Sequence, residues 1–137
     1  MGDQDVRWKQ RFENFEKARQ KFHNALAACQ KDPKNELYQM ALIQTFEFTY
    51  ELGWKTIKDF LQYEGVKKVS FPREVIKYGF HHHIIEEGQD WINMMDDRNL
   101  MAHTYDEEKA NKAIHNITQY YVKAIDQVYL YLKKKLD

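Results

Sequence analysis

A short segment near residue 100 holds the side chains best suited to chemistry. Arg98, Asn99, His103 and Tyr105 lie within eight residues of one another. The fixed fork of N–H donors on arginine suits a phosphate group, and histidine can give or take a proton near neutral pH. The combination predicts a site that binds a phosphate and moves a proton.

The spacing within this segment limits how the site can assemble. Asn99 and His103 are four residues apart, so they would share one face of a helix. Arg98 and His103 are five apart and would point from different faces. They can converge only if the helix ends between them, or if one of the two comes from a second chain.

A purely structural interpretation fits the same residues. Arg98 is the only cation in the acidic stretch 86–108, so it could pair with Asp96, Asp97 or a carboxylate on another helix. His103 could be an ordinary helix-terminal residue. Spacing alone favours this interpretation, because an arginine and a histidine five residues apart often occur by chance.

A carboxylate from a neighbouring helix could fix the guanidinium. Glu51 stands four residues from both Glu47 and Lys55, a pattern typical of a solvated ion-pair ladder. The aromatic residues beside Glu51, Tyr50 and Trp54, are expected to face the core. Glu51 is therefore the candidate supporting contact for Arg98.

Five amphipathic stretches must position these residues. Apolar side chains recur at helical spacing over about 5–31, 36–64, 70–81, 90–103 and 104–135. The expected N-terminal caps are Asn35, Ser70, Asp90 and Thr104, the last in a capping box with Glu107, and Gly65 is expected to end the second stretch. This pattern predicts an all-α, up-and-down four-helix bundle with one short extra helix, forming a single domain over residues 1–137.

The composition excludes several classes of protein. The single cysteine, Cys29, excludes an internal disulfide and a Cys-rich zinc site. Charges interrupt every apolar run before it could cross a membrane, and the N-terminus lacks the pattern of a signal peptide, so a cytoplasmic protein is expected. Consecutive residues on a helix point about 100° apart, so His81, His82 and His83 should not converge on one ion. We expect no metal site and no cofactor.

The net charge of zero hides a segregation of charge. Residues 7–34 carry a net +5, residues 86–108 a net −7 and residues 109–137 a net +4. An acidic block around Arg98 is unlike the broad basic surface of a general nucleic-acid binder. We therefore expect any contact with RNA to be local and to lie in a cleft.

The segment is also part of a recognisable motif. Arg98-Asn99-x-x-x-His103-x-Tyr105, followed by Asp106-Glu107, resembles the signature of the HEPN superfamily in its HepT-like branch, the nucleotidyltransferase substrate-binding proteins. The similarity extends over most of the chain. It includes the segments 11–15, 46–56, 72–76 and 91–99.

The resemblance implies a function as well as a fold. HEPN proteins are helical bundles that commonly form two-fold homodimers, and many are metal-independent RNases. By this likeness Arg98 would stabilise the transition state, His103 would move the proton, and Asn99 would orient the phosphate or base. Proteins of the HepT-like branch act with a separate minimal nucleotidyltransferase encoded nearby. In toxin–antitoxin pairs that partner adds AMP to the motif tyrosine, here Tyr105.

A second function is compatible with the same resemblance. The chain could be a non-catalytic subunit that binds substrate for, or docks onto, the nucleotidyltransferase. It carries no Gly-rich phosphate loop and no paired-carboxylate metal motif, so it is not expected to be the transferase itself.

Overall fold

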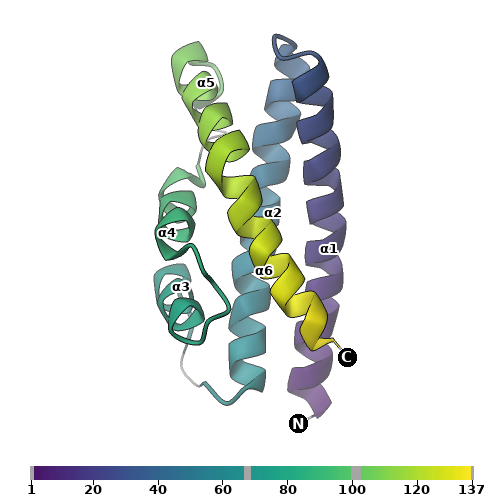
Figure 1. The fold of residues 1–137 in the computed structure, drawn as a ribbon, viewed down its shortest axis with the longest axis vertical. Helices are drawn as coiled ribbons and strands as arrows, with labels where there is room; N and C mark the ends of the chain where they lie inside the picture. The colour runs from purple at the N-terminus through teal and green to yellow at the C-terminus, as the bar shows by residue number, and fades with distance from the viewer. Residues whose placement is uncertain (1, 67–68, 100–102, 137) are drawn as a thin grey trace.

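The computed structural model of the chain describes residues 2–66, 69–99 and 103–136, and these residues form helices joined by short loops (Figure 1). In chain order the helices are α1 (Gly2–Lys31), α2 (Glu36–Tyr63), α3 (Pro72–His81), α4 (Gly88–Asp97), α5 (Glu107–Asn116), the π-helical segment η2 (Ile117–Tyr121) and α6 (Val122–Lys135). The predicted all-α fold is confirmed.

The long helices α1 and α2 pair along their length, and the run from α5 through η2 to α6 crosses them as a third long rod (Figure 1). The short helices α3 and α4 stack beside α2 (Figure 1). A single hydrophobic cluster joins these layers, and every helix contributes residues to it. Its largest fully buried side chains include Trp8, Phe12, Phe15, Phe22, Phe46, Tyr50 and Trp91.

The ends of α2 match the sequence prediction. The Asn35 side chain accepts a hydrogen bond from the backbone N–H of Tyr38 at 3.1 Å, which satisfies a free donor of the first turn. Gly65 adopts a φ of 100°, and the next residue, Val66, donates its N–H to the carbonyl of Leu61 at 2.9 Å. These are the bonds of a glycine-terminated helix end.

Three predicted helix starts, at Ser70, Asp90 and Thr104, are wrong. Helix α3 begins after Phe71, not Ser70, because the Glu74 carboxylate accepts hydrogen bonds from the backbone N–H groups of both residues. Helix α4 has Glu87 as its N-cap, which places Asp90 in the first turn, where a carboxylate suits the helix dipole.

The helix predicted over 90–103 is shorter in the structure, and the helix predicted to start at Thr104 starts later. Helix α4 ends at Asp97, and Asp96 and Asp97 place negative charge at the negative end of the helix dipole. Helix α5 begins after Asp106, whose side chain accepts from the backbone N–H of Lys109 at 3.2 Å. Residues 100–102 lie outside the described part of the chain.

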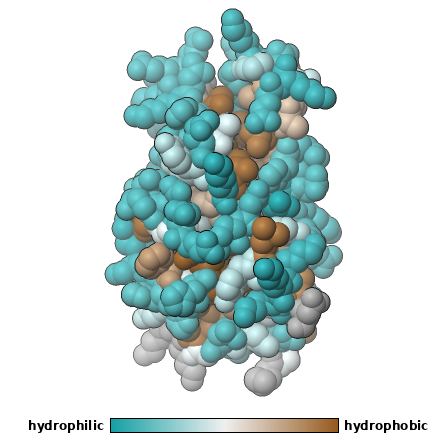
Figure 2. Space-filling view, in the orientation of Figure 1, coloured by the Kyte–Doolittle hydropathy of each residue, from teal (hydrophilic) through white to brown (hydrophobic). Residues whose placement is uncertain are grey.

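The outer surface is mainly polar. Hydrophilic side chains cover most of the face shown in Figure 2, and hydrophobic residues show only in smaller areas between them. Among the residues that the structure describes, no helix combines the length and apolarity needed to span a bilayer.

Candidate functional site

Helix α4 presents one face to α2, and Arg98 continues that face. Trp91 and Met94 are both fully buried on it. Arg98 follows Trp91 by seven residues and Met94 by four, so it lies in line with them at the C-cap of the helix. The buried residues thus fix α4 against the core and leave Arg98 exposed at its end.

The end of α4 is also tied to the π-helical segment. The hydroxyl of Tyr121 donates a short hydrogen bond of 2.5 Å to the carboxylate of Asp97. Burial raises the pKa of Tyr121 far above its usual value, and the hydrogen bond to Asp97 raises it further. The phenol therefore stays a neutral donor, and it fixes the residue that directly precedes Arg98.

Arg98 forms no ion pair with any of the other residues described in the structure. Asp97, its nearest neighbour in the acidic block, is engaged by Tyr121 instead. The described residues therefore give no support to the structural interpretation, in which Arg98 pairs with a neighbouring carboxylate. The guanidinium lies at an exposed position.

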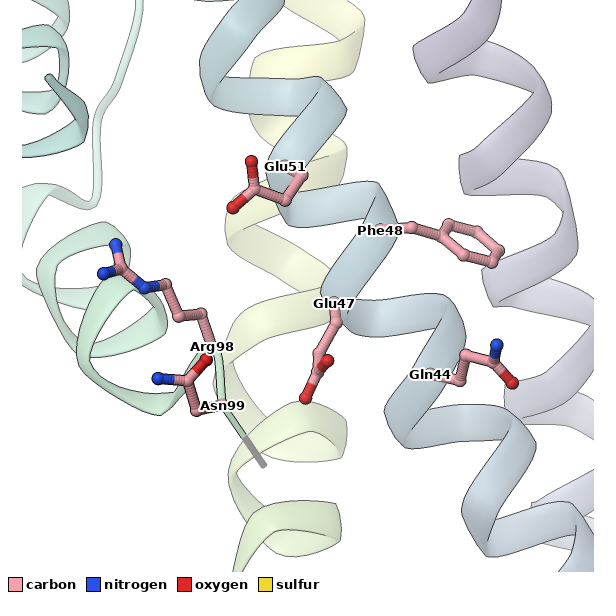
Figure 3. A pocket seen from close by; sticks show the side chains of 6 residues that line it. All are labelled: Gln44, Glu47, Phe48, Glu51, Arg98 and Asn99. Atoms are coloured by element: carbon pink, nitrogen blue, oxygen red, sulfur yellow. The ribbon is translucent and has the colours of Figure 1, made fainter. Parts of the chain in front are cut away.

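Arg98 and Asn99 form one wall of an open pocket of about 400 Å³, and α2 forms the other. The lining residues are Gln44, Glu47, Phe48, Glu51, Arg98 and Asn99 (Figure 3). Arg98 and Asn99 therefore lie on one side of this hollow and Glu51 on the other (Figure 3).

Glu51 faces Arg98 across the pocket without forming an ion pair with it (Figure 3). Its carboxylate accepts a hydrogen bond from Nε1 of Trp54 at 3.2 Å and lies 3.6 Å from Nζ of Lys55. These contacts hold Glu51 at the pocket edge. A direct role in fixing the guanidinium remains a prediction.

Tyr50 is the residue that sequence reasoning missed. It is fully buried, and its ring lies 5.9 Å from that of Trp91. Burial raises the pKa of the Tyr50 hydroxyl well above its usual range, Glu51 adds to the rise, and Arg98 opposes it. The sequence contains no signal that sets Tyr50 apart, because a tyrosine at helical spacing among aromatic residues is expected to be an ordinary core residue.

His103 and Tyr105 lie outside this pocket. Both are exposed, in a turn closed by a 3.0 Å hydrogen bond from the backbone N–H of Asp106 to the carbonyl of His103. The Tyr105 side chain is 84% exposed. The pocket therefore includes Arg98 and Asn99, but neither His103 nor Tyr105.

The described residues form no cluster of three or more His, Cys, Asp or Glu side chains arranged to hold a metal ion. His81, His82 and His83 are exposed where α3 ends, and His83 has a φ of 63°. The polar groups that line the pocket are the guanidinium of Arg98, the amides of Asn99 and Gln44, and the carboxylates of Glu47 and Glu51. Such a set can bind a phosphate and orient it, while proton transfer requires a group from elsewhere.

Comparison with known proteins identifies a family that matches most of the chain. The profile described as nucleotidyltransferase substrate binding protein like matches residues 10–134. A Haemophilus influenzae protein named probable ribonuclease HepT is 36% identical over 76 residues, which cover 50% of this chain and 49% of that protein. The chain thus spans about half the length of this curated relative.

Two solved structures share the fold. A protein from Thermus thermophilus is 30% identical, with a TM-score of 0.62 over 78% of this chain and 94% of its own. A Haemophilus influenzae protein, described as having the fold of a substrate-binding domain of a nucleotidyltransferase, is 21% identical, with a TM-score of 0.78 over 89% of this chain and 98% of its own. At that identity the second likeness shows the fold alone.

Proposed function

The chain belongs to the nucleotidyltransferase substrate binding protein like family, and from that premise we propose that it is an RNA-cleaving subunit of a two-component system with a separate minimal nucleotidyltransferase. Arg98 and His103 are the proposed catalytic pair. The observation that carries the proposal is the position of Arg98, an exposed cation that lines a pocket and has no ion-pair partner among the described residues.

The reaction suited to these groups is metal-independent cleavage of RNA by its own 2′-OH. His103 takes the proton of the 2′-OH or gives one to the departing 5′-oxygen, as the 2′-oxygen bonds to phosphorus and the bond to the 5′-oxygen breaks. Arg98 stabilises the extra negative charge on the phosphorus centre, and Asn99 orients the phosphate or base. The products are a 2′,3′-cyclic phosphate and a 5′-hydroxyl.

A second copy of the chain would complete the site. Leu37 and Met40 are 75% and 46% exposed at the start of α2, and they lie on the helix face that leads through Gln44 to Phe48 in the pocket wall. Exposed apolar side chains near the pocket support a two-fold homodimer in which Arg98 of one chain meets His103 of the other.

Tyr105 is the proposed site of modification by the partner transferase. Its phenol is accessible enough to enter the active site of another protein. In that step the phenol oxygen, having lost its proton, bonds to the α-phosphorus of ATP and pyrophosphate leaves. An adenylyl group two residues from His103 would add bulk and negative charge where RNA must enter, and would silence cleavage.

The proposal is tested by incubating purified protein with a mixed RNA substrate in the presence of EDTA. We expect the wild type to cleave, and His103→Ala and Arg98→Ala each to cleave at least about 100-fold more slowly. His115→Ala is the matched control, because His115 is an exposed histidine on α5 outside the motif. Equal cleavage patterns for the wild type and His103→Ala would rule out the RNase function.

One observation favours a second function, a non-catalytic subunit that docks onto the transferase. Glu47 and Glu51 place two carboxylates on the wall facing Arg98, and carboxylates repel an RNA backbone. A wild-type protein that cleaves no RNA but still binds the transferase and accepts AMP on Tyr105 would support this alternative.

A further inference from the structure

The hydroxyl of Tyr50 is a buried polar group, and the described residues packed around it provide no clear hydrogen-bond partner. The side chain is fully buried, and its Oη has no hydrogen-bond partner of standard geometry among the residues that the structure describes. A buried hydroxyl without a partner is costly, and phenylalanine would fill the same space without that cost. The hydroxyl therefore calls for a specific partner.

Arg98 is the group placed to be that partner. Tyr50 packs against Trp91, and Trp91 lies two helical turns before Arg98 on the same face of α4. Tyr50 also directly precedes Glu51, which lines the pocket opposite Arg98. Arg98 also opposes the rise in the pKa of the Tyr50 hydroxyl that burial causes, which is the effect expected of a cation near that hydroxyl.

We propose that Tyr50 is a positioning residue for Arg98, with its hydroxyl accepting an N–H of the guanidinium from within the core. Arginine has five N–H donors, so one can bind Tyr50 while the others face the pocket. The usual anchor for a catalytic arginine would be a carboxylate, which also neutralises it. A neutral phenol orients the guanidinium and leaves its full charge for a phosphate.

This assignment gives the neighbouring residues separate tasks. Tyr121 holds the backbone end of α4 through Asp97, Tyr50 orients the guanidinium, and Glu51 is held by Trp54 and Lys55 at the pocket edge. The importance of this orientation for cleavage rests on the proposed function. The contact itself does not, so the two can be tested apart.

The test compares Tyr50→Phe, which removes only the hydroxyl, with Tyr129→Phe as the control. Tyr129 is also buried, but its hydroxyl donates to Glu16 at the interface of α1 and α6. The first readout is the ¹⁵N–¹H NMR signal of the Arg98 side chain, assigned with Arg98→Lys. We expect its Nε–H to exchange with water about 10-fold faster in Tyr50→Phe than in the wild type or Tyr129→Phe, because a lost hydrogen bond changes an opening equilibrium by about that factor.

A second measurement uses the wild type alone, so it does not depend on the folding of a variant. We expect a nuclear Overhauser effect between the Tyr50 ring and the Arg98 side chain. The absence of that effect, or an Arg98 signal that is the same in the wild type and Tyr50→Phe, would overturn the proposal and would indicate a buried water as the partner of Tyr50.

Cleavage kinetics then connect the contact to function. In Tyr50→Phe we expect kcat for RNA to fall about 10-fold with KM changed less than about 2-fold, since a misoriented guanidinium loses transition-state contacts more than ground-state binding. Unchanged kcat would overturn the positioning role. A wild type that cleaves no RNA would refute the RNase function, and the NMR readouts would still decide whether Tyr50 holds Arg98.

Discussion

Two carboxylates near Arg98 are engaged by other residues. Asp97 accepts the Tyr121 hydroxyl, and Glu51 across the pocket is engaged by Trp54 and Lys55. Arg98 is exposed and has no ion-pair partner among the described residues, so its guanidinium is available to bind the anion of a ligand. At the scale of single residues, this is the feature on which the proposed function depends most.

The shape of the guanidinium should matter as well as its charge. Arg98→Lys preserves the positive charge but loses the planar fork that binds two phosphate oxygens at once. We expect single-turnover cleavage of RNA to slow by about 10- to 100-fold. Cleavage by the lysine variant at the wild-type rate would show that Arg98 acts only as a distant charge.

Tyr105 should accept the adenylyl group. After incubation with the partner transferase and ATP, intact-mass measurement should show added AMP on the wild type and none on Tyr105→Phe. Tyr120→Phe is the control, since Tyr120 is a second exposed tyrosine, 50% accessible. Added mass that persists in Tyr105→Phe would move the modification to another residue.

At the scale of elements, the contact between η2 and α4 should stabilise the fold. Tyr121→Phe removes the donor to a partly buried carboxylate, and we expect the free energy of unfolding to fall by about 1–3 kcal/mol. Tyr120→Phe, at the neighbouring exposed position, should change it by less than about 0.5 kcal/mol. Urea denaturation measures both, and equal stabilities would mean that the hydrogen bond does not hold α4.

The pairing of α1 with α2 contains a buried charge. The Asp59 side chain is 1% exposed and accepts a 3.0 Å hydrogen bond from Nε of Arg11. Arg11→Ala should lower the free energy of unfolding by about 3 kcal/mol, because it leaves the buried carboxylate without its cation. Replacing both residues, as in Arg11→Met with Asp59→Leu, should recover most of that loss. A single variant as stable as the wild type would contradict this interpretation.

The sequence predicted the elements that depend on local patterns. The apolar stripe of the first helix, which includes Trp8, Phe12 and Phe22, is buried as expected. Asn35 and Gly65 act at the ends of α2 as predicted, because a cap and a positive φ are local requirements.

The features that the sequence did not predict depend on tertiary contacts. Asp90 and Thr104 had the residue types of N-caps, but Glu87 and Asp106 are the caps in the structure. Tyr121, which donates a hydrogen bond to Asp97, lies in a π-helical segment, and the pattern of apolar residues does not predict that segment. For the same reason Tyr50 was indistinguishable from an ordinary core tyrosine.

At the scale of the whole molecule, the proposed catalytic residues Arg98 and His103 do not share one pocket. The pocket holds Arg98 and Asn99, whereas His103 lies outside it. The spacing of five residues already required either a helix end or a second chain, and α4 does end before Arg98. A two-fold dimer would provide two copies of the completed site and would confine RNA to a cleft within an acidic block.

The most direct test of this account mixes two inactive variants, Arg98→Ala and His103→Ala, under conditions that let dimers exchange subunits. If Arg98 of one chain works with His103 of the other, each mixed dimer has one intact site, and RNA cleavage should recover to about one quarter of the wild-type rate. If both residues act within one chain, no mixed dimer has an intact site. A mixture no more active than either variant alone would contradict the shared site.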